Sequence, residues 1–209
     1  MRVVQKSLYF RQYIEFLPTL THQNPDSMAR TPSTMLPLGT IMPSFDLPNV
    51  NGGSIKAPDS DATGEKGTLV MFICNHCPYV KHVDEEMRQL HADYKHRGIE
   101  TIAIMSNDVV NYPDDSPEKM AQQRYAFPYL YDETQEVAKA FQAACTPDFF
   151  LFDAQDKLIY RGQLDDSRPG NGVMVTGKDL RAAMDAVVAG NAVSADQVPS
   201  LGCNIKWKA

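Results

Sequence analysis

The chain has 209 residues, of which 43% are hydrophobic and 22% are charged, as in ordinary globular proteins. This length suits one domain with extensions better than two independent cores. The formal net charge of −6, with no cluster of Lys or Arg, argues against non-specific nucleic-acid binding. No apolar run approaches the length of a membrane span, and the first residues lack the pattern of a secretory signal. We therefore expect a cytoplasmic protein that binds neither nucleic acid nor membrane.

The composition divides the chain into three parts. Residues 1–34 combine a weakly amphipathic stretch with a connector rich in Pro, Ser, Thr and Asn, which predicts a poorly ordered N-terminal extension. Residues 35–192 carry the hydrophobic patterns of one folded domain. Residues 193–209 form a C-terminal tail, where Leu201 and Ile205 predict packing against the domain or against a second subunit. A homodimer is therefore one assembly that the sequence allows.

The first half of the domain shows a hairpin, a buried strand, a helix and a second strand. Residues 44–57 predict a short hairpin with its turn at 51–53, an Asn-Gly-Gly sequence. Residues 68–74 form an apolar run typical of a strand buried on both faces. Pro78 can open a helix, because it gives up only a donor that has no helical partner there. Helical spacing then continues until the buried strand predicted at 99–105.

The second half predicts two short helices, a hairpin and a final helix. Ser116 followed by Pro117 is typical of a helix start. Asp132 with Gln135 three residues on resembles a capping box before another helix. Strands at 149–152 and 158–161 flank a turn, and a last helix covers 177–189 before Gly190. This order predicts an α/β fold with a central mixed sheet and helices on both faces.

Two cysteines stand at the predicted junction between the first buried strand and its helix. Cys74 and Cys77 are separated by two residues in the segment LVMFICNHCPYVKH. A cysteine at a helix N-terminus faces unpaired N–H groups and the positive end of the helix dipole, which stabilise a thiolate. The thiolate is the form that attacks disulfides and peroxides. Because four cysteines are too few for a disulfide framework, the pair predicts redox chemistry or metal binding, with two inert packed thiols as the alternative.

Over about residues 38–208 the chain resembles the thioredoxin superfamily, and specifically its peroxiredoxin-like branch related to AhpC and TSA. The resemblance is carried by the cysteine segment and by the sequences FDLPNVNGGSIKAPD, FQAACTPDFFLFDAQDKLIYRG and SLGCNIKWK. It implies a thioredoxin-like three-layer α/β/α sandwich with a mixed central sheet and an N-terminal β-hairpin. It also implies that Pro147 is a cis-proline and that the backbone of Thr146 docks the substrate.

The resemblance also sets the register of the two cysteines. Counted from Phe72, Cys77 takes the first position of the thioredoxin tetrapeptide, which is also the peroxidatic position of peroxiredoxins. Peroxiredoxins have a threonine three residues before that cysteine and a proline seven before it, whereas this chain has Cys74 and Val70. Thioredoxin has a buried acid where this chain has Met71. The chain therefore departs from both relatives at positions that assist their chemistry.

The expected activity is thiol–disulfide exchange or, as a second form, thiol-dependent peroxide reduction with an antioxidant role. The Cys77 thiolate would attack a disulfide or peroxide substrate, and Cys74 would resolve the adduct. Electrons would come from a dithiol protein or a small thiol, with no cofactor beyond the protein's own sulfurs. Cys145, close to Pro147, is interpreted as a packed neutral thiol, with resolution of Cys77 as its alternative. Cys203 is a lesser candidate as a third redox partner, since the sequence does not fix the position of the tail.

Two other classes of function remain open from the sequence. Cys74, His76, Cys77 and His82 offer thiolate and imidazole ligands for a copper or zinc site, as in a metallochaperone. Against a metal, these residues are too close in sequence for all four side chains to converge easily, and Cys77 and His82 do not share a helix face. A redoxin-fold binding module without turnover is the other alternative, with Asp165, Asp166 and Arg168 as loop residues that could contact a partner.

Overall fold

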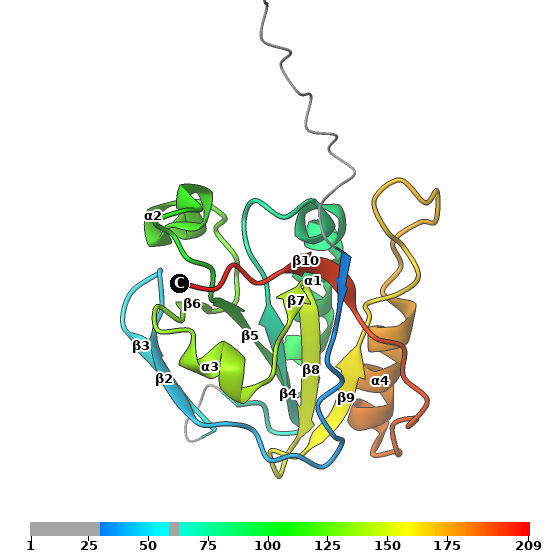
Figure 1. Ribbon diagram of the computed structural model, residues 1–209. Coiled ribbons are helices and arrows are strands. Elements are labelled where there is room, and N and C mark those ends of the chain that lie inside the picture. Colours follow the sequence, from blue (N-terminus) through cyan, green and yellow to red (C-terminus); the bar gives the residue numbers. More distant parts are fainter. Residues whose placement is uncertain (1–29, 59–62) are drawn as a thin grey trace, which may run out of the picture.

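The computed structural model describes residues 30–58 and 63–209. Its centre is a five-stranded sheet in the order β6-β5-β4-β8-β9 (Figure 1). Strand β4 pairs in parallel with β5 and antiparallel with β8, so the sheet is mixed, as the sequence predicts. The strands are β4 (Gly67–Phe72), β5 (Ile99–Met105), β6 (Tyr129–Tyr131), β8 (Asp148–Asp153) and β9 (Leu158–Gly162).

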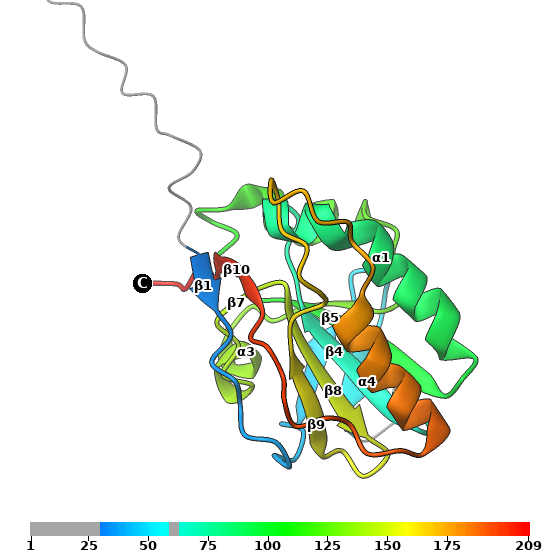
Figure 2. The ribbon, with the colours of Figure 1, turned by 90° about the vertical axis from the view of Figure 1, so that its right-hand side faces the viewer.

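The two faces of this sheet bury separate apolar clusters. Every residue of β4 is buried, and alternate side chains point to opposite faces. Leu69 and Met71 pack with α1 (Pro78–Lys95) and α4 (Lys178–Ala189), which cover one face (Figure 2). Val70 and Phe72 pack on the other face with the second cluster. A short helix, α3 (Glu136–Ala140), and the hairpin of β2 (Phe45–Pro48) and β3 (Ser54–Ala57) contribute to this cluster. The result is the predicted layered α/β/α arrangement.

The remaining elements between and before these strands are short. Strands β2 (Phe45–Pro48) and β3 (Ser54–Ala57) form the predicted N-terminal hairpin. A 3₁₀ turn, η2 (Pro113–Asp115), leads into α2 (Pro117–Ala121) between β5 and β6, and α3 covers Glu136–Ala140. In the described part of the chain, no helix is long and apolar enough to cross a membrane.

The capping box predicted at Asp132 and Gln135 is wrong in its details. Gln135 adopts a left-handed backbone with φ of 64°, and α3 begins only after it. Its side-chain amide donates to the carbonyl oxygens of Ser106 and Lys206, so it holds the C-terminal tail instead of the helix start. Asp132 does cap the helix, because its carboxylate accepts the backbone N–H of Ala138 at 2.9 Å.

A second, three-stranded sheet joins the two ends of the described chain. Its order is β1-β10-β7, all antiparallel, with β1 (Arg30–Pro32), β10 (Leu201–Asn204) and β7 (Cys145–Thr146). Residues 30–34, which the sequence assigns to the N-terminal extension, therefore begin with a paired strand, whereas 1–29 lie outside the described residues. Ile205 is buried in the second apolar cluster, so the tail packs against its own domain. This small sheet brings β10 beside the loop that carries Thr146 and Pro147.

Candidate active site

Cys77 is the residue immediately before α1. Strand β4 ends at Phe72, and five residues lead from it to Pro78, the first residue of the helix. Cys77 keeps an extended backbone, with φ of −66° and ψ of 123°, while its carbonyl oxygen accepts the N–H of Lys81 at 3.0 Å. Its thiol therefore faces the N-terminal end of an 18-residue helix, where N–H groups lack helical partners.

Three of the four cysteines meet at this helix start. Sγ of Cys77 lies 2.7 Å from Sγ of Cys203 and 3.2 Å from the carbonyl oxygen of Thr146. Sγ of Cys74 lies 3.3 Å from the hydroxyl of Thr146, so Thr146 contacts both sulfurs of the C-x-x-C segment. Cys74, Cys77 and Cys203 belong to the same buried cluster, and all three are free thiols. We call these three residues the thiol cluster.

The hydrogen bonds of the thiol cluster favour a single thiolate, on Cys77. Hydrogen bonds from the thiols of Cys203 and Cys74, helped by the backbone N–H of Val80, outweigh burial and hold the pKa of Cys77 far below its usual range. The two thiols that donate to Cys77 have raised pKa values. The hydrogen bond to Cys77, together with burial, raises the pKa of Cys203 and of Cys74. These pKa shifts therefore favour Cys77 as the thiolate of the cluster, flanked by two neutral thiols.

Cys145 stands apart from the thiol cluster although its neighbour Thr146 contacts both Cys74 and Cys77. Its Sγ is directed to the carbonyl oxygen of Pro147, at 3.6 Å. Burial, followed by the charge of Asp148, raises the pKa of this thiol. The geometry fits the interpretation of Cys145 as a packed neutral thiol.

The Thr146–Pro147 peptide is cis, as the resemblance implies. Thr146 also pairs with Cys203 in the small sheet, which sets β10 directly against the loop of the cis-proline. Thr146 and Pro147 thus lie at the thiol cluster, and the site residues predicted from the sequence come together.

A buried acid that the sequence analysis missed fixes the loop between β4 and α1. Asp115 is fully buried, and its carboxylate accepts the backbone N–H groups of Asn75 and His76 at 2.8 and 3.2 Å. The same carboxylate contacts Nδ1 of His76 at 2.6 Å and accepts the side-chain amide of Asn107 at 2.8 Å. The charge of Asp115 also contributes to the raised pKa of Cys74. In the sequence, Asp115 resembles an ordinary surface acid that follows another acid in a turn, so no local signal identifies it.

The four candidate metal ligands from the sequence do not form one ligand set in the structure. Nε2 of His82 lies 2.7 Å from the hydroxyl of Ser167, and Sγ of Cys77 contacts Cys203 and Thr146. Cys74 and His76 form a group with Asp115, with potential ligand atoms within 4.8 Å of one another, and this group includes neither Cys77 nor His82. Because both oxygens of Asp115 already accept hydrogen bonds, a metal ion there would have to displace them. The metal alternative is therefore not favoured.

The loop residues considered for a binding module stabilise their own loop. Asp165 is buried, and its carboxylate accepts backbone N–H groups, including that of Gly177 at 2.7 Å. The guanidinium of Arg168 donates to the carbonyl oxygen of Ser167 and to the side chain of Gln163. These contacts explain the two residues as supports of the 163–177 loop.

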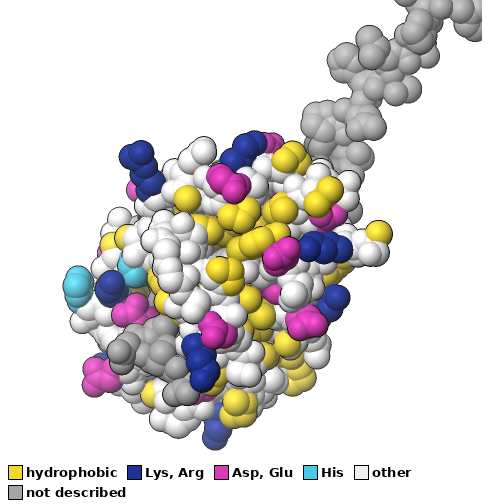
Figure 3. Space-filling model, turned by 90° about the vertical axis from the view of Figure 1, so that its left-hand side faces the viewer, with side chains coloured by type: hydrophobic (Ala, Val, Ile, Leu, Met, Phe, Trp, Pro, Cys, Tyr) yellow, Lys and Arg dark blue, Asp and Glu magenta, His cyan; other side chains and the backbone are white. Residues whose placement is uncertain are grey.

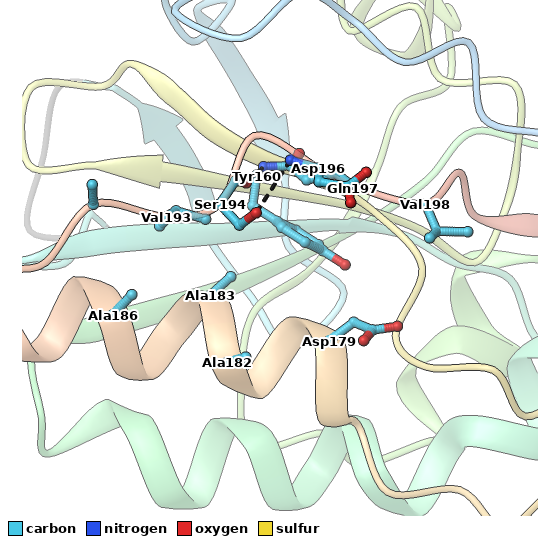
Figure 4. A pocket seen from close by; sticks show the side chains of 11 residues that line it. Tyr160, Asp179, Ala182, Ala183, Ala186, Val193, Ser194, Asp196, Gln197 and Val198 are labelled. Atoms are coloured by element: carbon cyan, nitrogen blue, oxygen red, sulfur yellow. Dashed lines mark hydrogen bonds between the residues drawn. The ribbon is translucent and has the colours of Figure 1, made fainter.

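Two surface depressions lie away from the thiol cluster. Figure 4 shows one between α4 and residues 192–198, lined by small side chains together with Tyr160, Asp179 and Gln197. The other lies between β2 and α3, on the face where Figure 3 shows exposed hydrophobic side chains among scattered charges. The lining of neither depression includes a cysteine or a histidine.

Strand β10 lies over Cys77. Cys77 is 0% exposed and Cys203 only 2%, so the cluster is closed to solvent. A small depression reaches its edge, where Tyr79, Pro147 and Leu201 line it together with residues of the 163–169 segment. A substrate that approaches Cys77 from this side must displace β10 or that segment.

This arrangement, a mixed sheet with a cysteine at the helix start beside a cis-proline, defines a thioredoxin-like protein. The AhpC/TSA family matches residues 38–161, and the chain belongs to this family. No curated protein sequence matches the chain significantly.

Solved structures share this fold. An uncharacterized conserved protein from Geobacillus kaustophilus is 53% identical with a TM-score of 0.83, covering 87% of this chain and 97% of its own. A hypothetical protein from Sinorhizobium meliloti 1021 is 46% identical with a TM-score of 0.82, covering 86% and 99%. A candidate thiol:disulfide interchange protein DsbE from Chlorobium tepidum is 22% identical with a TM-score of 0.57, covering 73% and 99%. At that identity, the last likeness shows the fold alone.

Proposed function

We propose that this protein is a thiol–disulfide oxidoreductase in which the Cys77 thiolate attacks a disulfide substrate. The observation that carries the proposal is the position of Sγ of Cys77, at the start of α1 and 2.7 Å from a second thiol. Hydrogen-bond donors around this sulfur lower its pKa, so the reactive thiolate exists at neutral pH. A second thiol of the cluster completes the reaction.

The chemistry transfers two electrons. The thiolate of Cys77 forms a mixed disulfide with one sulfur of the substrate, and the other sulfur leaves as a thiolate. A neutral thiol of the cluster, Cys74 or Cys203, then attacks Sγ of Cys77 and releases the second substrate sulfur as a thiol. The protein ends with an internal disulfide. A dithiol protein or a small thiol would restore it, as in the reducing cytoplasm that the sequence predicts.

Disulfides are the preferred substrates over peroxides. In peroxiredoxins a threonine three residues before the nucleophile helps to orient the peroxide, and here that position is Cys74. Its thiol points to the hydroxyl of Thr146 instead. Peroxide reduction by Cys77 remains the alternative activity, and the same protein preparation can test it.

The test is reduction of insulin or of oxidised glutathione by the full-length protein, with dithiothreitol as the electron source. Wild-type protein should accelerate the reaction, and Cys77→Ser should reduce it to the uncatalysed background. Cys145→Ser removes a buried thiol outside the thiol cluster and is the matched control, which should keep the wild-type rate. Full turnover by Cys77→Ser, or none by the wild type, would contradict the proposal. A faster reaction with hydrogen peroxide than with disulfides would assign the peroxidase activity instead.

A further inference from the structure

We propose that Cys203, on the C-terminal strand β10, and not Cys74 of the C-x-x-C segment, is the thiol that resolves the adduct on Cys77. This inference rests on the proposed function, since it names the second thiol of the same reaction. It gives the C-terminal tail a chemical role, through Cys203, which lies 126 residues after Cys77 in the sequence.

The distance between the sulfurs is the first argument. Sγ of Cys203 lies 2.7 Å from Sγ of Cys77, and a disulfide bond needs about 2.05 Å. A sub-ångström movement of the two side chains therefore brings the sulfurs to bonding distance. The sulfur of Cys74 lies 3.3 Å from the hydroxyl of Thr146.

The backbone around Cys203 holds the thiol in this position. Cys203 pairs with Thr146 of β7 on one side and with Arg30 of β1 on the other. The preceding residue, Gly202, fits against the cis-proline loop only because it lacks a side chain. A Cβ there would lie 2.1 Å from the carbonyl oxygen of Thr146. The strand pairing of β10 therefore fixes the position of Cys203 next to Cys77.

Neighbouring charges favour Cys203 as the attacking sulfur. The largest cause of the raised pKa in both Cys203 and Cys74 is the hydrogen bond to Cys77, which disappears once Cys77 is in a mixed disulfide. The remaining influences on the pKa differ between Cys203 and Cys74. Burial still raises the pKa of both thiols. The charge of Lys206 lowers the pKa of Cys203, whereas the carboxylate of Asp115 raises that of Cys74 against the lowering effect of the Thr146 hydrogen bond. The positive charge of Lys206 therefore supports the thiolate that Cys203 needs for attack, beside the short distance between the sulfurs.

The resolving step balances without another reagent. In the mixed disulfide, Sγ of Cys77 is bonded to a substrate sulfur. Sγ of Cys203 attacks Sγ of Cys77, the bond to the substrate sulfur breaks, and that sulfur leaves with the proton of the Cys203 thiol. Cys77 and Cys203 together lose two electrons, and the disulfide substrate gains them as two thiols. A thiol reductant then cleaves the bond between α1 and β10.

Peptide mapping can identify the disulfide directly. Reduced full-length protein is treated with oxidised glutathione, blocked with an alkylating agent, and digested with trypsin without reduction. Cys74 and Cys77 share the tryptic peptide 67–81, whereas Cys203 lies in 182–206. A Cys77–Cys203 bond joins two peptides, but a Cys74–Cys77 bond leaves one peptide lighter by two hydrogens. We expect the joined peptides in wild-type protein and in Cys74→Ser.

Cys203→Ser should lose this crosslink and accumulate glutathione on Cys77. An internal Cys74–Cys77 disulfide in wild-type protein, or a crosslink that Cys74→Ser abolishes, would overturn the inference while leaving the proposed function intact. If Cys77 stays unmodified in every variant, the proposed function itself fails. Because the wild-type map decides between the two disulfides, the result does not depend on the folding of a variant, which circular dichroism checks separately.

Discussion

Oδ2 of Asp115 lies 2.6 Å from Nδ1 of His76, inside a loop that the same carboxylate also holds through two backbone N–H groups. A buried acid on η2 therefore shapes the segment that carries Cys74 and Cys77. Asn107 extends the connection, since its side chain donates to Asp115 and accepts the backbone N–H of Lys206 at 2.8 Å. The loop of the nucleophile and the segment after β10 thus share one hydrogen-bond network.

Replacing Asp115 by Asn should destabilise the protein by about 1–3 kcal/mol at neutral pH, because charge-assisted hydrogen bonds in a buried site are lost. Burial opposes ionisation of this carboxyl, but hydrogen bonds from His76 and Asn107 outweigh it and lower its pKa. The stabilisation is therefore complete above about pH 4 and is lost as the pH falls through that lowered pKa. Urea unfolding of the wild type and of Asp115→Asn at a series of pH values measures this difference in the free energy of unfolding.

Asp114→Asn is the matched control for that measurement. Asp114 is an adjacent surface acid, paired with Lys119, and its removal should leave stability nearly unchanged. An equal loss for both variants would show that the Asp115 network does not hold the loop.

Gly202→Ala should separate β10 from the nucleophile without altering any thiol. The new Cβ would meet the carbonyl oxygen of Thr146 at 2.1 Å, so the strand must move away from the cis-proline loop. Loss of the hydrogen bond from Cys203 should then raise the pKa of Cys77, while the opened cover speeds its alkylation. The rate of iodoacetamide modification of Cys77, followed by mass spectrometry against pH, measures both effects.

Gly170→Ala serves as the comparison for Gly202→Ala. It strains a left-handed surface residue, but the added Cβ meets no atom within 4 Å. Its Cys77 should react at the wild-type rate. Unchanged reactivity in Gly202→Ala would contradict the role of β10 as the cover of Cys77.

Asp148→Asn should stabilise the protein at alkaline pH. Asp148 is completely buried, and neither carboxylate oxygen has a partner in good hydrogen-bond geometry among the described residues. Burial raises its pKa to about 7, while Ser33 and nearby backbone N–H groups offset only part of that effect. Stability that the neutral carboxyl provides is therefore fully present below about pH 4 and is lost as the pH rises through 7.

Denaturant unfolding from pH 4 to 8 checks this prediction. The wild type should fall below Asp148→Asn by about 2–4 kcal/mol above pH 7, and the two should converge at the acid end. Parallel profiles over the whole range would show that Asp148 does not titrate in the folded protein near neutrality.

The sequence predicts the parts of the site that depend on local patterns. The apolar run of β4 and the three-and-four spacing of α1 place Cys74 and Cys77 at their junction, and the structure agrees. Strand β10 is too short to carry a periodic signal, and its pairing with β7 joins residues far apart in the chain. The contact of Cys203 with Cys77 depends on that pairing, so the sequence could not give it more than a minor role.

The sequence also does not predict the buried hydrogen-bond networks of the site. Gln135 matches a capping-box pattern, yet its amide bonds the backbone of the tail, because tertiary contacts compete with local capping. Asp115 follows another acid in an ordinary turn sequence, and only the folded chain brings it under the loop of the nucleophile. Both residues act through long-range contacts that spacing alone does not reveal.

A pH titration of thiolate ultraviolet absorbance tests the central claim, that Cys77 is the ionised sulfur, most directly. Reduced wild-type protein should show one thiolate already present at neutral pH and below, because hydrogen bonds from Cys203 and Cys74 lower the pKa of Cys77. Cys77→Ser should lack this signal, Cys203→Ser should shift it to higher pH, and Cys145→Ser should leave it unchanged. If the wild type shows no thiolate until the pH reaches about 8 to 9, the usual range of a free cysteine, Cys77 is not the activated nucleophile.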